Sequence, residues 1–187
     1  MKYRSNQFFK NYDGCIFEIF LTSSYDDDIV EGHIDFFDYI EQDGREVKKN
    51  LATINFFIFN IYNFEDMLFL ADSISLDLEY VVNAYNFYGN NIGGMGSTAI
   101  IDELILYIEP KDYNEKLQII KYFLVKTIEK LQIIGTGTLL FMSKALILNL
   151  NKTDKIYLIN ELLDINCIPI YQDENDVVLA RNLEYIV

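Results

Sequence analysis

Residues 100–137 constrain the fold of this chain more than any other part of the sequence. Residues 100–109 are almost continuously apolar, which predicts a buried central strand that a proline ends. Apolar residues at helical spacing over residues 112–130 predict a long amphipathic helix. A short turn with glycines follows, and residues 135–148 begin as another apolar strand. A strand–helix–strand unit of this kind can hold a phosphate-bearing cofactor at the start of its helix.

The residues before this unit predict three strands and then one or two helices. Strands are expected over residues 16–23, 29–40 and 51–62, and Asp43-Gly44 indicates a hairpin between the second and the third. His33 lies inside the second strand, where a packing role is favoured over a catalytic one.

Polar residues mark the expected helix starts. Asn63 begins a helical region, Ser75 is a candidate N-cap for residues 75–87, and Asp112 or Asn114 is a candidate cap for the long helix. The polar sequence at residues 151–154 predicts a turn and a cap for a further helix over residues 155–164.

Composition narrows the class of protein. Of 187 residues, 51% are hydrophobic, which is enough for one domain with a sizeable core. The formal net charge of −14 argues against a general nucleic-acid or anionic-membrane binder and favours a basic partner. Short apolar runs predict no transmembrane helix, and residues 1–14 show no signal peptide, so a cytoplasmic protein is expected. Cys15 and Cys167 are expected to be free thiols.

Neither a metal site nor a phosphate loop stands out. Asp26, Asp27 and Asp28 lack the spaced oxygens, the glycine and the distal glutamate of a calcium loop, so a solvated turn is expected there and no metal. The glycine-rich residues 89–97 follow a helix and precede a strand, which is the reverse of a phosphate-binding loop. We interpret them as a surface loop.

The second half of the chain has a recognisable order of elements. The strand at residues 104–109, the helix at 114–131, the strand at 138–142 and the helix at 153–164 precede a hairpin over residues 168–182. This order, with the closing sequence ELLDINCIPIYQDENDVVLARNL, resembles the GNAT superfamily of acyl-CoA N-acyltransferases. The resemblance implies an α+β fold. It would be a single domain over residues 1–187, with a mixed, mostly antiparallel, twisted sheet of about seven strands and helices on both faces.

The resemblance also implies an acetyl-CoA site. In that family the fourth strand splays from the fifth, the pantetheine lies in the gap, and backbone N–H groups at the helix start hold the pyrophosphate. The corresponding residues here are Leu106, Tyr107, Ile108, Tyr113, Asn114, Glu115, Lys116 and Leu117. The family's glycine signature is missing from this turn, and Asp112 and Glu115 would stand beside a phosphate. The string over residues 132–137 matches the signature, but it lies at the wrong end of the helix and is interpreted as a C-cap.

Three residues are candidates for catalysis. Glu109, at the expected end of an apolar strand, is the candidate general base. The family's usual acid is a tyrosine in the helix before the closing hairpin, and that position holds Leu162 here. Tyr157 on the same helix and Tyr171 on the next strand are the substitutes, although most tyrosines in this chain are expected to pack.

Two functions follow from these observations. The first is an N-acetyltransferase that moves an acetyl group from acetyl-CoA to an amine of a small molecule or a protein. The second is a non-catalytic GNAT-like protein that binds another protein, as an inhibitor or an immunity-type factor. The sequence leaves both functions open, and a homodimer as well.

Overall fold

One sheet runs through the part of the chain that the structure describes. The computed structural model describes residues 15–24, 28–61, 63–89, 92, 94–147, 151–174 and 176–184. Its strands are β1 (Ile16–Ser24), β2 (Ile29–Gln42), β3 (Arg45–Phe59), β4 (Ser97–Leu106), β5 (Thr136–Met142), β6 (Ile168–Gln172) and β7 (Val177–Asn182). Its helices are α2 (Phe64–Ile74), α3 (Leu76–Tyr88), α4 (Tyr113–Ile133), α5 (Ser143–Leu146) and α6 (Lys152–Leu163).

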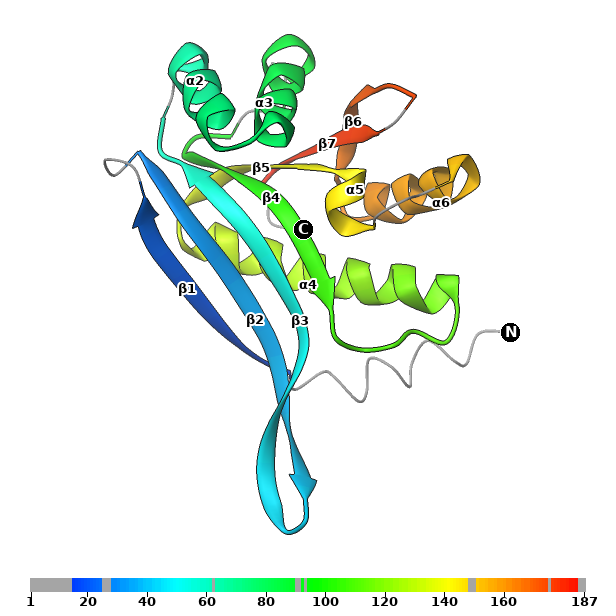
Figure 1. Cartoon of the computed structure of the whole chain (residues 1–187). Coiled ribbons are helices and arrows are strands. Elements are labelled where there is room, and N and C mark those ends of the chain that lie inside the picture. The colour runs from blue at the N-terminus through cyan, green and yellow to red at the C-terminus, as the bar shows by residue number, and fades with distance from the viewer. Residues whose placement is uncertain are drawn as a thin grey trace.

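The seven strands form a mixed sheet in the order β1-β2-β3-β4-β5-β7-β6 (Figure 1). Every neighbouring pair is antiparallel except β4 and β5, which are parallel and joined through α4. The prediction of an α+β fold with a mostly antiparallel sheet is therefore confirmed.

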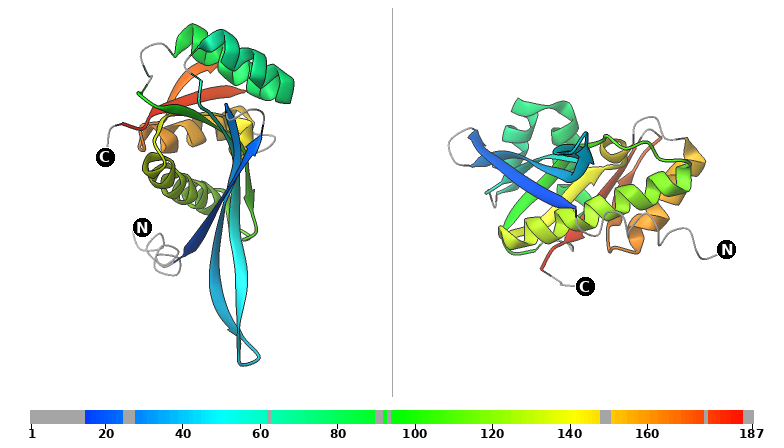
Figure 2. Two further views of the ribbon diagram at one scale, coloured as in Figure 1. Left: turned by 90° about the vertical axis from the view of Figure 1, so that its left-hand side faces the viewer. Right: turned by 90° about the horizontal axis from the view of Figure 1, so that it is seen from below.

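Helices cover both faces of the sheet, as predicted (Figure 2). α2 and α3 pack on one face, in a buried cluster that includes Ile100 of β4 and Leu140 of β5. α4 and α6 pack on the other face, in a larger cluster that includes Ile101 and Leu139. Neighbouring residues of β4 and β5 therefore point to opposite cores, and all seven residues of β5 are buried. This explains why the central strands have an almost continuous apolar sequence.

The outer ends of β2 and β3 form an arm that stands clear of the body (Figure 1). The arm comprises residues 39–50, and each of them is exposed. Its tip turns at Asp43 and Gly44, whose φ angles of 53° and 73° are those of a two-residue hairpin turn. The hairpin is thus confirmed. The expected start of the third strand at residue 51 is wrong, because the charged residues from Arg45 onward already pair with β2.

β7 takes an interior position in the sheet. It pairs with β5 on one side and with β6 on the other. Residues 177–181 are buried, and their side chains alternate between the two cores. The hairpin expected over residues 168–182 is confirmed, with its strands at Ile168–Gln172 and Val177–Asn182. The turn before them places Asn166 at φ 58°, a left-handed conformation that asparagine tolerates well.

Local polar residues cap the helices where the sequence indicates. The side chain of Asn63 accepts a hydrogen bond from Glu65 N at 3.0 Å. Ser75 caps α3 through Leu78 N, and Asn151 caps α6 through Asp154 N. Each cap satisfies a backbone donor that the helix itself leaves without a partner.

One strand in the second half has other bounds than expected. β4 begins at Ser97 and ends at Leu106, so residues 107–109 belong to the following loop. β5 ends at Met142, as expected from the strand over residues 138–142, and the short helix α5 follows it. Asp176 is the physical reason for α5, because its carboxylate accepts hydrogen bonds from Ser143 Oγ and Lys144 N at the start of that helix.

Some expectations fall outside the described residues: the first fourteen residues (1–14), most of the polar turn with Asp26 and Asp27, and positions 90, 91 and 93 of the glycine-rich stretch. Among the described helices, none combines the length and apolar character needed to cross a membrane.

Candidate functional site

β4 and β5 run side by side and then separate. Their parallel pairing ends where Ile101 lies opposite Phe141. Beyond this point β4 continues along β3 to Leu106, whereas β5 stops at Met142 and the chain turns into α5. The two strands therefore diverge at the carboxyl end of β5, the edge at which parallel strands commonly bind ligands.

A bulge in β4 marks the point of separation. The register of β4 with β3 shifts after Ile101, so that Asp102 is an extra residue. One extra residue reverses the direction of the side chains that follow, so Leu104 packs in the same buried cluster as Ile101. Asp102 and Glu103 are both exposed. The bulge thus places two adjacent carboxylates beside the gap between the strands.

A pocket of about 350 Å³ opens between the diverging strands, α3 and α5. Its charged side chains come from α3, β4 and α5. The lining residues are Asp77, Leu78, Val81, Ile100, Ile101, Asp102, Glu103, Leu104, Met142, Lys144, Ala145 and Leu146.

Carboxylates outnumber cations in this pocket. Lys144 Nζ lies 2.6 Å from Asp77 Oδ1, so its charge is engaged there. Although Asp102 is exposed, the pocket walls remove part of its hydration, and this desolvation, together with the negative charges of Glu103, Asp77 and Glu31, raises its pKa above the ordinary value. A carboxylate in such a site attracts a cation and can accept a proton. The arrangement is therefore suited to an amine.

The start of α4 is occupied by its own carboxylates. Asp112 Oδ1 accepts a hydrogen bond from Glu115 N at 2.8 Å, and Lys111 N donates to Glu115 Oε2 at 2.5 Å. Asp112 is thus the cap that the sequence offered as one of two candidates. The carboxylates of Asp112 and Glu115 lie where the resemblance implies a pyrophosphate. Their negative charges would repel those of the phosphates. These residues do not fit acyl-CoA.

α5 packs against β4 at this edge of the sheet. Ala145 and Leu146 are buried in one cluster with Leu104 of β4 and Leu117 of α4. The hydroxyl of Tyr113 also donates to the backbone oxygen of Asp154 at 3.1 Å, which ties the start of α4 to α6.

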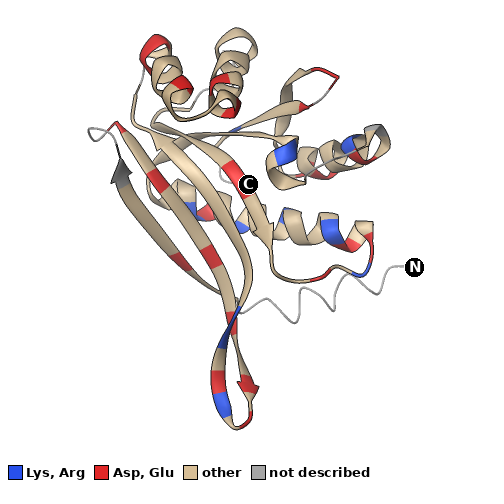
Figure 3. Cartoon of the chain, viewed as in Figure 1, with Lys and Arg blue, Asp and Glu red and all other residues tan. Residues whose placement is uncertain are grey.

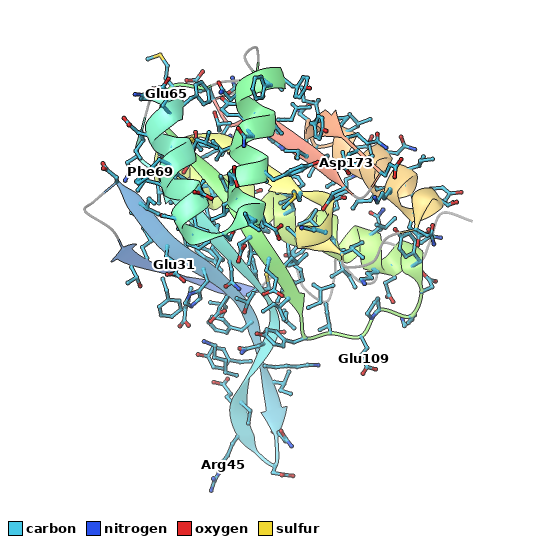
Figure 4. All side chains as sticks on the ribbon, turned by 45° about the horizontal axis from the view of Figure 1, so that its top comes forward. Glu31, Arg45, Glu65, Phe69, Glu109 and Asp173 are labelled. Atoms are coloured by element: carbon cyan, nitrogen blue, oxygen red, sulfur yellow. The ribbon has the colours of Figure 1, made fainter. Side chains whose placement is uncertain are left out.

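The structure does not bring the three candidate catalytic residues together. Glu109 is exposed on the loop after β4 and is labelled in Figure 4. Its expected position at a strand end is wrong, because the strand ends at Leu106. Tyr157 is exposed on α6, beside the α4 core, whereas Tyr171 packs against the α3 core on the other face of the sheet. None of the three lines the pocket described above.

The eight residues expected to bind a cofactor lie along one stretch, from the end of β4 into the first turn of α4. Several of them have structural partners. Tyr107 N donates to Leu51 O at 3.0 Å, and the Tyr107 hydroxyl lies 3.4 Å from Thr53 Oγ1. Leu117 is buried. Most of this stretch therefore serves the packing of the loop and the helix.

Sequence reasoning did not identify Asp77, Asp102 and Lys144 as site residues. One signal for Asp102 was present, since Asp102 and Glu103 interrupt an otherwise apolar central strand. Asp77 and Lys144 meet through a contact between residues 67 positions apart, which no local pattern reveals.

The two glycine-containing stretches have a structural explanation. A Cβ atom on Gly137 would lie 2.3 Å from Met95 O, and one on Gly94 would lie 2.2 Å from Gly137 O. The backbones before β4 and at the start of β5 therefore touch directly, which only glycine permits. Gly135 has φ 88° at the end of α4, in agreement with the interpretation as a C-cap turn.

Comparison of the chain with models of known protein families gives no match, and comparison with curated proteins gives none either.

Proposed function

We propose that this chain is a GNAT-like protein that acts by binding another protein and does not use acyl-CoA. The GNAT-like part rests on the order of elements from β4 to β7, on the parallel pairing of β4 with β5, and on the divergence of these two strands. The binding role rests on the arm.

The arm is the observation that carries the binding role. A two-stranded ribbon without a core beneath it has little stability of its own. Residues 39–42 nevertheless pair in register with residues 45–48, and the arm exposes Tyr39, Ile40 and Val47 at its surface. Acidic and basic residues both occur along the arm (Figure 3). Apolar side chains on a protruding ribbon suit the centre of an interface, and the surrounding charges suit its rim.

The start of α4 supports a role without acyl-CoA. Asp112 caps the helix and Glu115 lies in its first turn, so two carboxylates lie where a pyrophosphate would have to bind. Acetyl-CoA titrated into the protein is expected to give no heat and no thermal shift at 1 mM ligand (about ten times a 0.1 mM Kd). Saturable binding would refute this part of the proposal.

The arm is tested by purifying partners from the cells that make the protein. We expect a partner that the wild-type chain retains and that a double variant, Ile40→Ser with Val47→Ser, loses. These two residues face each other across the ribbon. Ile133→Ser is the matched control, because Ile133 is also an exposed isoleucine but lies at the end of α4. Retention of the same partners by the arm variant would exclude the arm as the contact.

The pocket supports a second candidate function, N-acetyl transfer to a cationic amine. Asp102 would accept the proton of the amine there. The acetyl-CoA titration separates the two candidates, since the transferase requires binding and the first proposal excludes it. A transferase would also lose activity on Asp102→Asn and keep it on Glu109→Gln.

A further inference from the structure

A second pocket, of about 190 Å³, lies on the outer side of α3 where that helix meets β6. Its lining consists of Tyr80, Asn83, Ala84, Phe87, Tyr88 and Tyr171. The α3 residues recur three or four positions apart, so they form one stripe along the helix. Ala84 is the small residue in this stripe, and it leaves the room that the neighbouring rings enclose. Phe87 and Tyr88 are 71% and 59% exposed, which is high for aromatic residues.

The rings are held in several orientations. Tyr88 stacks on Tyr171 with 5.2 Å between ring centroids. Tyr80 meets the edge of Tyr171 at 68° with centroids 5.8 Å apart, and Phe87 is tilted by 55° against Tyr88. The pocket thus has aromatic walls that face different directions. Such walls form the cages that surround quaternary ammonium groups.

The charges near this pocket favour a cation. The Tyr80 hydroxyl donates a 2.6 Å hydrogen bond to Asp173 Oδ2, and Asp173 Oδ1 accepts from Asp176 N at 2.8 Å. Burial and the hydrogen bond to Asp173 raise the pKa of Tyr80, so the hydroxyl keeps its proton and remains a donor. Donation to a carboxylate makes the ring of Tyr80 richer in electrons. Asp173 lies on the turn after β6, on the α3 side of the sheet (Figure 4).

None of the six lining residues carries a positive charge, and the whole chain has a net charge of −14. A cation entering the pocket therefore meets ring faces and a nearby carboxylate without a competing lysine or arginine in the lining. The volume is below that of pockets for drug-sized ligands, so it suits one small group.

We propose that the pocket formed by Tyr80, Phe87, Tyr88 and Tyr171 binds the quaternary ammonium group of a small organic cation. The rings surround the methyl groups, and Asp173 supplies the long-range attraction. This site is separate from the pocket between β4 and β5 and does not depend on the function proposed above.

The test compares choline with 3,3-dimethylbutan-1-ol, its uncharged analogue of the same shape, by NMR titration of the wild-type protein. Choline is expected to bind at least about fivefold more tightly, because only the charged ligand gains the cation–π attraction. Equal binding of the two compounds, or no saturation by choline, would overturn the proposal. This comparison needs no variant, so folding defects cannot obscure it.

Two variants locate the site. Phe87→Leu removes one exposed wall and is expected to weaken choline binding at least threefold. Phe69→Leu is the matched control, because Phe69 is 73% exposed on α2 and lies outside the pocket lining. Unchanged binding by the Phe87 variant would place the ligand elsewhere. A peptide that contains trimethyllysine is titrated in the same way. If the peptide binds more than tenfold more tightly than choline, the ligand is a protein and the proposal of a small cation is wrong.

Discussion

Replacing Gly137 with alanine should destabilise the fold strongly, although the change adds one methyl group. The added Cβ would lie 2.3 Å from Met95 O and 2.7 Å from the Met95 carbonyl carbon. Both neighbours are backbone atoms, so no side-chain rotation relieves the overlap. β4 and β5 must then separate at their start, where Leu183 N donates to Gly137 O at 2.8 Å. Overpacking of this kind costs about 1–3 kcal/mol, and a disturbed hydrogen bond adds about 1 kcal/mol.

A loss of about 3 kcal/mol corresponds to a fall in Tm of roughly 10 °C for a chain of this size. Thermal unfolding followed by circular dichroism measures it. Gly135→Ala is the matched control two residues earlier, since a Cβ there meets nothing within 4 Å and only the left-handed φ of 88° opposes it. That variant should lose about 1–2 kcal/mol. If Gly137→Ala melts no lower than Gly135→Ala, the backbone contact does not explain the glycines.

Three further predictions follow from buried or charged groups. Asp102→Asn should raise the Tm at pH 7. The gain in the free energy of unfolding should stay below about 1 kcal/mol, because exposed charges are screened. The raised pKa of Asp102 means that the folded protein holds this proton more tightly than the unfolded chain does. The folded protein therefore loses stability as the pH rises above the ordinary pKa of an aspartate. The advantage of the variant should therefore vanish below about pH 4, and a gain that persists there would contradict the assignment. Asp176→Ala should cost about 3 kcal/mol in chemical denaturation, since Ser143 Oγ and the start of α5 lose their buried acceptor; Asp176→Asn, which keeps one oxygen, should cost less. A thiol reagent should modify Cys15 first, because Cys167 is fully buried and burial raises the pKa of its thiol to about 12. Mass spectrometry of partially labelled protein would show the order, and faster labelling of Cys167 would be inconsistent with this core.

Elements that depend on local signals were predictable from the sequence. Asp43-Gly44 specifies its hairpin through backbone conformation alone, and Asn63 and Ser75 cap their helices within three residues. Asn166 marks the turn into the C-terminal strands in the same way. The polar residues around these turns act on their immediate neighbours, so the printed sequence contains the necessary information.

Elements that depend on distant contacts were not predictable. α5 starts on a carboxylate 33 positions later in the chain, and the sequence around Ser143 shows no cap of its own. The bulge that exposes Asp102 depends on the register of β4 against β3. The glycines at 94 and 137 resemble ligand-binding glycines in sequence because both uses require a backbone without a side chain. Only the contact between the backbones at Gly94 and Gly137 shows that these glycines serve packing and not ligand binding.

The interior position of β7 affects how the chain folds during synthesis. β5 emerges from the ribosome well before β7, so its free edge waits for a strand that is made later. β6 cannot protect that edge, because β7 must enter between them. Such late, long-range pairing slows folding and prolongs the exposure of apolar strands to other chains. A nascent chain shorter than about 177 residues should therefore depend on chaperones, and truncation before β7 should yield insoluble protein.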